Sequence, residues 1–491
     1  MYRTKNTRQL ELENFYLPFG GHLNPKNRWV ELAQLIPWEE FEEEYAELFA
    51  EQELGGIAAK PFRMALGALL IKEKLGITDR ETVQQIRENH YLQYLIGMEG
   101  YRDEEPFDPT LMVHFRKRIT ADMLNTINER LHEEQVKKKR KSEKETETEE
   151  EAEGVEPENK GKLLVDATCT PADISYPTDL KLLNDGRSKL EEIIDVLHEP
   201  YKGEQKKVRT YRLKARKDYL KVAKKRRPSK QKIRSGIRKQ LQYIARNLRH
   251  IQELGETEEF GQKSPLASLS GRMYKNLLVI AELYRQQKEM YDQRSHKIAD
   301  RIVSISQPHV RPIVRGKANA EVEFGAKISV AMVDGYSFLE KLSWDAFNEA
   351  GELKNHIENY YRRFGYYPTS VHVDEIYRNR ENRNYCKAKG IQISGPPLGR
   401  PPKDPDEYRR LLKGAKQSEI ERIPIEGKFG NGKRKYGWSR ISSKLKNTSE
   451  TSIAMTVLVM NFEKISRDLL LLIFSLLRRL EFFLRGGPKF A

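Results

Sequence analysis

The sequence has few cysteines and no apolar segment long enough to cross a bilayer. Its 491 residues include only two cysteines, Cys169 and Cys386, and they do not form a C-x-x-C pair. Neither a disulfide framework nor a thiolate zinc site is therefore expected. Near the C-terminus, the apolar run from Leu469 to Leu477 covers nine residues. That is less than half of the length of a membrane-spanning helix, so no membrane partner is expected.

The first residues, MYRTKNTRQLELEN, do not have the pattern of a signal peptide. They contain no apolar core followed by a cleavage site, which argues against secretion. The sequence therefore predicts a cytoplasmic protein, associated with the nucleoid if its partner is DNA.

Charge is abundant and unbalanced. The chain carries 88 Lys and Arg against 72 Asp and Glu, giving a net charge of +16 and an isoelectric point near 9.4. This excess favours a polyanionic partner. A soluble protein with a basic surface and no such partner is equally compatible with charge alone.

Residues 1 to 136 show helical patterns. Within PFRMALGALLIKEKLG, Phe62, Leu66 and Leu69 repeat at helical spacing and Gly76 can end the helix. Thr78 to Glu81 has the pattern of a capping box that starts a second helix, ending near Asn89. The pair is compatible with a DNA-reading helix pair, but an ordinary helical hairpin is the more common explanation of so permissive a turn pattern. A further helix opens at 108–109 and carries two candidate DNA contacts, Arg116 and Arg118.

Residues 137 to 162, KKKRKSEKETETEEEAEGVEPENKGK, contain almost no apolar side chain. Such a segment cannot bury enough surface to order itself, so we expect a charged flexible linker that ends the N-terminal helical domain.

Residues 163 to 480 then form the predicted catalytic domain, with a helix-rich insertion at about 180–307. The segment Lys202–Arg249 of this insertion holds twenty Lys or Arg and two acids. Such density suits a phosphate backbone, and a solvated helix face is the alternative. The most concentrated candidate DNA contacts there are Lys224, Lys225, Arg226 and Arg227.

The remaining order is strand, insertion, β-hairpin, helix, strand, helix, strand. The first strand is Leu163–Val165, and an Asp334-Gly335 turn joins the strands at 324–333 and 336–342. A helix is expected at 347–363, a strand at 370–373, a helix at 379–389 and a strand at 391–393. Without the insertion, this order matches a ribonuclease-H-like mixed sheet. The predicted fold is thus an α/β core with a large helical insertion and an all-α N-terminal domain.

Three carboxylates are the candidate catalytic and metal-binding residues. Asp166 follows the first predicted strand and Asp374 the strand after the hairpin, so pairing of these strands would bring both together. Glu426 is the third, whereas Asp334 already has a structural reason to occupy a turn. Hard oxygen ligands suit two Mg²⁺ or Mn²⁺ ions, which can stabilise an in-line phosphoryl displacement. Cap or turn roles for the aspartates remain the alternative.

The segment around Glu426, ERIPIEGKFGNGKRKYGWSR, contains a G-x-x-x-x-G-K match. A nucleotide-binding loop needs a hydroxyl after the lysine, and Arg434 stands there instead. On a helix, Arg422, Glu426 and Lys433 would share one face, although glycines 427, 430 and 432 weaken a helix. Together with Lys428 and Arg434, these cations are candidate DNA contacts beside a metal site. An exposed ion pair on a helix is the alternative.

Five blocks of the chain carry a family resemblance: LLVDATCTPADISYPTDLKLLN, RPIVRGKANAEVEFGAKI, VDEIYRNRENRNYC, SGPPLGRPPK and RIPIEGKFGNGKRKYGW. With them the chain resembles the DDE transposases of prokaryotic insertion sequences, in the group named after insertion sequence five. The resemblance implies a ribonuclease-H-like catalytic domain and metal-ligand roles for Asp166, Asp374 and Glu426. The related signature Tyr-x2-Arg-x3-Glu-x6-Lys is met at Arg422, Glu426 and Lys433, but Glu419 replaces its tyrosine.

The sequence therefore predicts a transposase that binds the terminal inverted repeats of its element and cuts and joins DNA with divalent metal ions. Its expected partners are double-stranded transposon ends and target DNA, bound by a homo-oligomer, most simply a dimer. A nuclease that hydrolyses DNA without strand transfer is one alternative. A domesticated DNA-binding protein with an inactive site is the other.

Overall fold

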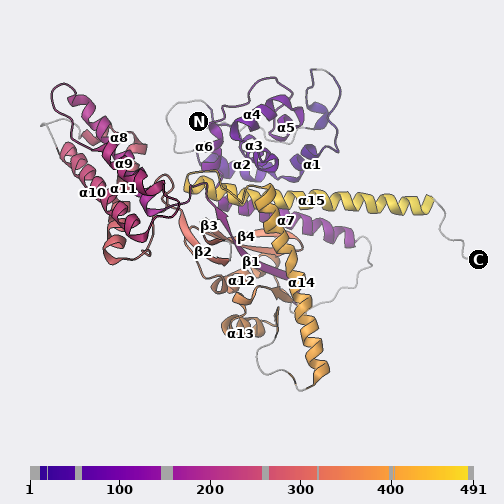
Figure 1. The fold of residues 1–491 in the computed structure, drawn as a ribbon. Coiled ribbons are helices and arrows are strands. Elements are labelled where there is room, and N and C mark those ends of the chain that lie inside the picture. The colour runs from indigo at the N-terminus through magenta and orange to yellow at the C-terminus, as the bar shows by residue number, and fades with distance from the viewer. Residues whose placement is uncertain are drawn as a thin grey trace, which may run out of the picture. The chain divides into compact units, whose positions relative to one another are not determined.

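A computed structural model describes residues 11–18, 20–49, 58–144, 159–256, 265–317, 320–396, 402 and 404–484. The chain forms two compact units (Figure 1). Unit 1 comprises Met1–Pro171, Lys327–Ser343 and Phe347–Ala491, and unit 2 comprises Ala172–Ala326 and Trp344–Ala346.

The N-terminal part of unit 1 is helical, as predicted. Gly76 ends α3 with a φ of +66°, and the Thr78 side chain accepts a hydrogen bond from the Glu81 amide at the start of α4. Burial of Phe62, Leu66 and Leu70 on α3 explains the spacing of these residues. The elements are η1 (Leu12–Asn14), α1 (Arg28–Leu35), α2 (Trp38–Glu47), α3 (Phe62–Leu75), α4 (Asp79–Glu88), α5 (His90–Leu95), α6 (Leu111–Arg118) and α7 (Ala121–Lys144).

The α7 helix corrects the predicted linker boundary. It extends to Lys144, so the first part of the segment predicted as a flexible linker is helical. Residues 145–158 of that segment lie outside the described residues. The N-terminal helices and most of the sheet belong to unit 1, and their predicted separation into two domains stays a prediction.

The sheet has six strands in the order β2-β3-β1-β5-β6, with β4 paired to β3. The β1–β5 and β5–β6 pairs are parallel, whereas β2–β3 and β3–β4 are antiparallel. The α/β class predicted from the sequence is confirmed. The strands are β1 (Lys162–Pro171), β2 (Arg311–Lys317), β3 (Ala320–Val333), β4 (Tyr336–Ser343), β5 (Ser370–His372) and β6 (Gln392–Ile393).

Two strand predictions change. β1 continues to Pro171, so Asp166 lies inside a strand and not at its end. The apolar signal stops at Asp166 because the following Ala, Thr and Cys residues are small, yet most of them are buried. β2 was not predicted at all. The Asp334-Gly335 hairpin is confirmed, with φ values of +49° and +80° at its two turn residues.

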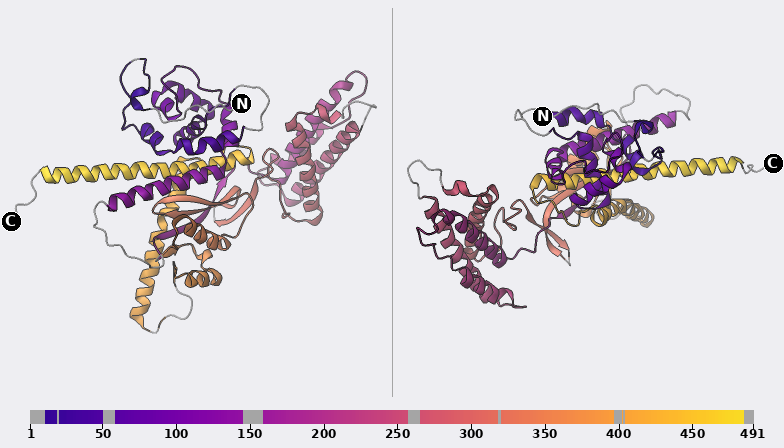
Figure 2. Two further views of the ribbon diagram at one scale, coloured as in Figure 1. Left: turned by 180° about the vertical axis from the view of Figure 1, so that it is seen from behind. Right: turned by 90° about the horizontal axis from the view of Figure 1, so that it is seen from above.

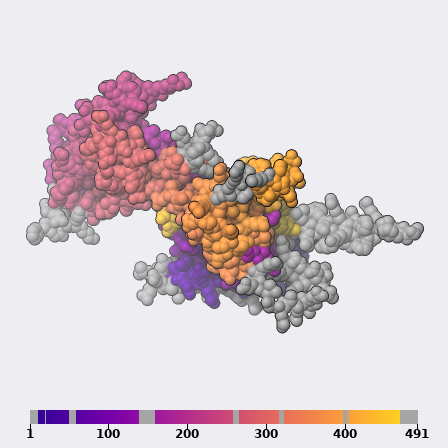
Figure 3. All heavy atoms as spheres, turned by 90° about the horizontal axis from the view of Figure 1, so that it is seen from below, coloured from indigo at the N-terminus to yellow at the C-terminus, as the bar shows by residue number. Residues whose placement is uncertain are grey.

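The C-terminal helices of unit 1 complete the core. α15 runs beside α7 and also packs on β4 (Figures 1 and 2). The segment that contains α12, β5 and α13 forms a continuous surface, orange in Figure 3. The elements are η4 (Glu349–Glu352), α12 (Leu353–Phe364), η5 (Glu375–Tyr377), α13 (Arg380–Ala388), α14 (Pro405–Lys435) and α15 (Lys446–Leu484).

α14 is a continuous helix through the glycines that were expected to weaken it. The G-x-x-x-x-G-K match therefore lies on a helix, not on a phosphate-binding loop. At Gly432 a Cβ atom would come within 2.4 Å of the Trp438 ring, and that ring is fully buried. Close packing thus requires glycine there, although glycine costs a helix about 1 kcal/mol relative to alanine.

Unit 2 confirms the predicted helical insertion. Its four long helices are α8 (Asp179–His198), α9 (Arg212–Ala223), α10 (Lys230–Gly255) and α11 (Gly271–Gln293), with short helices η2 (Glu199–Tyr201) and η3 (Pro265–Ser268). They pack around buried leucine and isoleucine side chains, including Leu183, Leu190, Ile244 and Ile280. In both units, no described helix is long and apolar enough to span a membrane.

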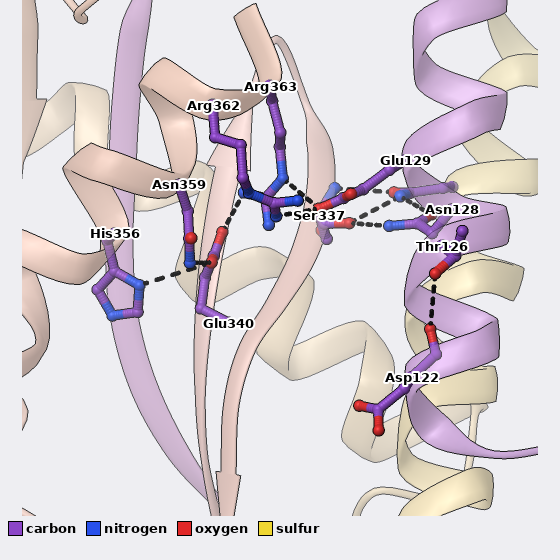
Figure 4. A network of polar contacts seen from close by, with 11 residues as sticks. Asp122, Thr126, Asn128, Glu129, Ser337, Glu340, His356, Asn359, Arg362 and Arg363 are labelled. Atoms are coloured by element: carbon purple, nitrogen blue, oxygen red, sulfur yellow. Dashed lines mark hydrogen bonds and ion pairs between the residues drawn. The ribbon is translucent and has the colours of Figure 1, made fainter.

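A buried polar network joins α7, β4 and α12 in unit 1 (Figure 4). Glu340 on β4 is 1% exposed, accepts a hydrogen bond from Asn359 at 2.6 Å and pairs with Arg363. Arg363 also donates to Glu129 on α7 at 2.6 Å. Burial alone would raise the pKa of Glu340, but His356 and Arg363 outweigh it and lower the pKa to about 2. The network therefore ties the N-terminal helices to the sheet.

Replacing Glu340 by Gln should destabilise unit 1 by about 3 kcal/mol at pH 7, because Arg363 stays buried without this counter-charge. The folded-state pKa lies below the ordinary 4.5, so this stabilisation is present above pH 4.5 and is lost as the pH falls toward 2. Denaturant unfolding of the wild type and Glu340→Gln at pH 7 and at pH 3 measures the difference. Glu133→Gln, which removes an exposed partner of Arg130, should change stability by less than about 1 kcal/mol. An equal loss in both variants would contradict the argument.

Candidate active site

Strand register places the two predicted aspartates side by side. β1 pairs with β5 through Lys162 and Ser370, Leu163 and Val371, and Leu164 and His372. Asp166 and Asp374 each lie four residues beyond the first of these pairs (166 − 162 and 374 − 370). The prediction that these strands are neighbours is therefore confirmed, although Asp166 is not at a strand end. Asp374 lies two residues beyond the end of β5 and is exposed.

The Asp374 side chain also has a local structural role. Its carboxylate accepts a hydrogen bond from the Glu375 amide at 2.8 Å and caps η5. The cap interpretation considered for the aspartates thus holds for Asp374 in this structure. One carboxylate oxygen makes this contact, and the other can still bind a ligand.

Polar contacts hold α14 against β1 and β5 at the residues that precede Glu426. Glu421 on α14 pairs with Lys162 on β1 at 2.8 Å and lies 3.4 Å from His372 on β5. The His372 ring also lies 3.2 Å from the Ser418 carbonyl oxygen. Ile425, between these contacts and Glu426, is fully buried. These contacts fix the rotation of the helix and hence the direction of its next side chains.

Arg422 connects two of the three predicted carboxylates. Its guanidinium lies 3.4 Å from Asp166 Oδ2 and 2.8 Å from Glu426 Oε1. The Arg422 and Asp166 side chains are 20% and 16% exposed, whereas Glu426 is 54% exposed. The predicted shared face of Arg422 and Glu426 is therefore present. A single cation bridges carboxylates that are 260 residues apart in the chain (426 − 166).

Asp166 has an unusual environment for a carboxylate. Burial, together with the negative charges of Glu349 and Asp374, raises its pKa to about 6, against the lowering effect of the Ala167 amide and of Arg422. Several acidic groups thus converge on Asp166, as is common where a cation is bound.

Sequence reasoning missed two neighbours of Asp166, Glu349 and Tyr377. Glu349 pairs with Lys327 at 2.8 Å, and its charge acts on Asp166 more strongly than that of Asp374. The Tyr377 ring is fully buried, and burial together with Glu349, Asp166 and Asp374 raises its pKa. Glu349 lay inside a segment predicted as an ordinary helix, and no local pattern distinguishes it from an exposed glutamate.

The donor set suits hard divalent cations, since all three predicted ligands offer carboxylate oxygens. Among the described residues, however, no three His, Cys, Asp or Glu side chains are grouped closely enough to hold a metal ion. The arrangement instead has the Arg422 cation between Asp166 and Glu426. A metal ion at these carboxylates would therefore have to replace that guanidinium.

The predicted phosphate contacts on α14 are accessible to different degrees. Arg434 is exposed, whereas Lys433 and Lys428 are half-buried. Burial, together with the nearby positive charges of Arg467 and Lys464, lowers the pKa of Lys428 to about 8, against the opposing effect of Asp468. A bound polyanion would offset the repulsion among these cations, of which Lys464 also pairs with Asp468 at 2.7 Å.

The two predicted contacts on α6 have structural partners. Arg116 is 7% exposed, and its guanidinium donates two hydrogen bonds to Asp79 on α4, at 2.9 and 2.5 Å. We therefore withdraw Arg116 as a direct DNA contact, because its charge is already used inside the fold. Arg118 is half-buried and lies over the Phe49 ring at 4.5 Å.

In unit 2, part of the basic segment is used internally. Lys239 and Tyr243 contact Asp218 at 3.1 Å each, and Arg234 lies 3.9 Å from the centre of the Tyr291 ring. The four predicted contacts Lys224, Lys225, Arg226 and Arg227 are all exposed in the connection between α9 and α10. Lys232 lowers the pKa of Lys225 by repulsion between like charges.

Two family models match this chain. The model described as "Transposase domain (DUF772)" matches residues 18–118, which include α1 to α6. The model described as "Transposase DDE domain" matches residues 371–463, which include Asp374, Arg422 and Glu426. Asp166 lies outside both matches.

A Rhizobium meliloti protein, described as "Uncharacterized protein ORF8 in nfe locus", is 31% identical over 160 residues. The alignment covers 33% of this chain and 69% of that protein. No solved structure matches. The two transposase models match at both ends of the fold, and the second of them spans two of the three predicted carboxylates. The chain therefore belongs to the DDE transposases of insertion sequences.

Proposed function

We propose that this transposase binds the terminal inverted repeats of its own insertion sequence and catalyses metal-dependent cleavage and strand transfer of DNA. Asp166, Asp374 and Glu426 are its catalytic carboxylates. The observation that carries the proposal is that Asp166 on β1 and Asp374, two residues beyond β5, each lie four residues after the first pair of these parallel strands, with Glu426 linked to Asp166 through Arg422.

The element order supports a ribonuclease-H-like core. Without the insertion, the chain passes from β1 through the β3–β4 hairpin to α12, β5, α13 and β6, which is the order expected from the sequence. The strands that carry Asp166 and Asp374 are adjacent and parallel. Carboxylates brought together from distant segments in this way can share divalent ions.

The three carboxylates would hold Mg²⁺ or Mn²⁺, most simply two ions, which supply charge stabilisation for an in-line displacement at phosphorus. Water attacks the phosphodiester, a P–O bond forms, and the bond to the 3′ oxygen breaks to leave a 3′-hydroxyl. That hydroxyl then attacks a target phosphodiester in the same manner. Positioning and charge stabilisation supply the rate, so no covalent enzyme intermediate is needed.

Arg422 changes partners in this scheme. In the structure it neutralises Asp166 and Glu426, and in the complex it would pair with a DNA phosphate. Guanidinium groups bind phosphate and carboxylate oxygens with the same geometry, so the exchange replaces one set of charge-assisted hydrogen bonds by another. Lys433 and Arg434, further along α14, would bind phosphates of the same DNA strand.

The remaining candidate contacts would bind the duplex outside the cut. Lys428 has cationic neighbours on α15, Arg118 lies on α6, and the exposed loop 224–227 lies in unit 2. Contacts of this kind fix position and carry no sequence information. Pairing of two transposon ends requires two active sites, which favours a homodimer in the synaptic complex.

Asp374→Asn should reduce cleavage of a transposon-end duplex on the order of a thousandfold, because one charged ligand oxygen is lost at the reacting centre. End binding should change by less than about twofold, since no phosphate contact is removed. Gel-based cleavage and binding assays in Mg²⁺ measure both. Asp103→Asn, which removes an exposed partner of Arg87, should leave both unchanged. A variant at Asp374 that still cuts would remove this residue from the site.

The products of the wild-type reaction separate transposition from simple hydrolysis. Joined molecules of end and target DNA identify strand transfer. Cleaved ends without joined products would support the nuclease alternative.

Arg422→Gln should strengthen Mn²⁺ binding to the DNA-free protein by about fivefold, because an ion pair worth about 1 kcal/mol no longer competes for Asp166 and Glu426. Calorimetric titration with Mn²⁺ measures this directly. Arg434→Gln, which changes an exposed arginine on the same helix, is the matched control and should leave the affinity unchanged. Weaker Mn²⁺ binding by Arg422→Gln would show that the guanidinium supports the metal site instead of occupying it.

Neutralising the exposed loop of unit 2, by replacing Lys224, Lys225, Arg226 and Arg227 with Gln, should weaken duplex binding about tenfold or more in moderate salt. Fluorescence anisotropy with a labelled transposon end measures the affinity. A matched double variant, Arg285→Gln with Lys288→Gln, removes cations that pair with acids on α11 and should have a much smaller effect. Equal affinities for the loop variant and wild type would show that this loop is only a solvated surface.

A further inference from the structure

Two distant segments of unit 1 enclose a cleft of about 550 Å³. One wall is the turn between α3 and α4, from Gly76 to Arg80, and the other is the connection between α14 and α15, from Tyr436 to Ser443. Neither the Arg422 site nor the predicted DNA contacts on α14 line this cleft. Arg116, withdrawn above as a direct contact, does line it.

The two walls are packed closely and are shaped by glycine. Gly76 and Gly437 both have left-handed backbone conformations, with φ of +66° and +78°. A Cβ atom at Gly76 would lie 3.8 Å from the Lys435 carbonyl oxygen, and one at Gly437 would lie 3.5 Å from Glu73 Oε1. Each segment therefore turns sharply at the position where it meets the other, which fixes the width of the cleft.

The floor of the cleft is a rigid polar layer. Glu73 is buried, and Thr456 on α15 donates a hydrogen bond to it at 2.9 Å. The same hydroxyl contacts the Tyr436 carbonyl oxygen at 2.8 Å. Burial raises the pKa of Glu73. The Thr456 hydroxyl thus links Glu73 on α3 to the residue that follows α14.

The charge of the lining is positive. Lys72, Arg80 and Arg440 line the cleft, together with Glu73 and the Arg116–Asp79 ion pair, whose two charges offset each other. Asp79 is neutralised by its two hydrogen bonds from Arg116. Arg80 and Arg440 are exposed, one on each wall. An anion between the walls would therefore meet a guanidinium from each side.

Two further features suit an oxyanion. The first turn of α4 borders the cleft at Thr78, Asp79 and Arg80, and the first amides of a helix have no partner within the helix. The buried Arg116 side chain also borders the cleft, and its Nε atom has no hydrogen-bond partner. The exposed Ser442 adds a hydroxyl, whereas the Ser452 hydroxyl already donates to the Thr448 carbonyl oxygen at 3.0 Å and lies 3.1 Å from the Ser443 hydroxyl. The lining thus offers hydrogen-bond donors from both walls, beside the apolar side chains of Ile77, Tyr436 and Ile441.

We propose that this cleft binds the sugar-phosphate backbone of a DNA duplex, with Arg80 and Arg440 contacting phosphates from opposite walls. The proposal rests on the DNA-binding function proposed above and adds a contact that joins the N-terminal helices to the C-terminal half of the fold. A phosphodiester matches the donors and the charge, and a chain with a net charge of +16 attracts a polyanion more strongly than a single phosphate.

The test compares the full-length wild type with the double variant Arg80→Gln, Arg440→Gln. Removing two phosphate contacts should lower the slope of log affinity against log salt by about two. The matched control, Arg102→Gln with Arg130→Gln, removes two exposed arginines that pair with acids elsewhere in unit 1, and its slope should equal that of the wild type. Equal slopes for the cleft variant and the control would overturn the proposal.

Two additional measurements locate the contact. Iron-EDTA tethered at Ser442→Cys should cut a bound duplex at a defined position, and the cut should disappear in the double variant. Inorganic phosphate at millimolar concentration should not displace the duplex. Displacement by phosphate together with an unchanged salt slope would assign the cleft to a small anion and overturn the proposal.

The outcomes also separate this inference from the proposed function. If Asp374→Asn loses cleavage while the cleft variant keeps the wild-type salt slope, the proposed transposase mechanism stands. Only the proposed DNA contact in the cleft is then contradicted. A wild-type protein that binds no duplex would contradict both.

Discussion

The parallel pairing of β1 with β5 is the constraint on which the site depends. It brings segments more than 200 residues apart into one register, so that Asp166 and Asp374 lie at equivalent positions. A shift of one residue would turn one aspartate to the opposite face of the sheet. Leu163, Val165, Val371 and Val373 are buried in this register, and so are Leu164 and His372 on the opposite face of the sheet.

The third carboxylate depends on a different kind of contact. α14 lies against β1 and β5, and Glu421 contacts Lys162 and His372 from both strands. Each of these polar contacts is individually modest, but the buried Ile425 and Phe429 add packing on the same helix. The position of Glu426 is therefore a consequence of how α14 docks, and Arg422 links that helix back to the strand.

Buried polar contacts, in addition to the apolar core, connect the helices of unit 1 to its sheet. The Glu340 network ties α7 and α12 to β4, while Glu73 and Thr456 tie α3 to α15. Such contacts are specific in geometry, since each buried donor needs its acceptor. They place the N-terminal helices, the sheet and the C-terminal helix in one compact unit, and the cleft between α4 and the α14–α15 connection follows from this arrangement.

The sequence by itself determined the local elements whose signals are contained in a few adjacent residues: the Thr78 cap, the Gly76 stop, the Asp334-Gly335 hairpin and the helical insertion. It also identified the family, because its motifs are contiguous. Only the tertiary structure decided that β1 continues past Asp166, that Glu349 and Tyr377 surround this aspartate, and that Arg116 is used internally. These features depend on partners far away in the chain, and local periodicity carries no information about which distant side chain neutralises a charge.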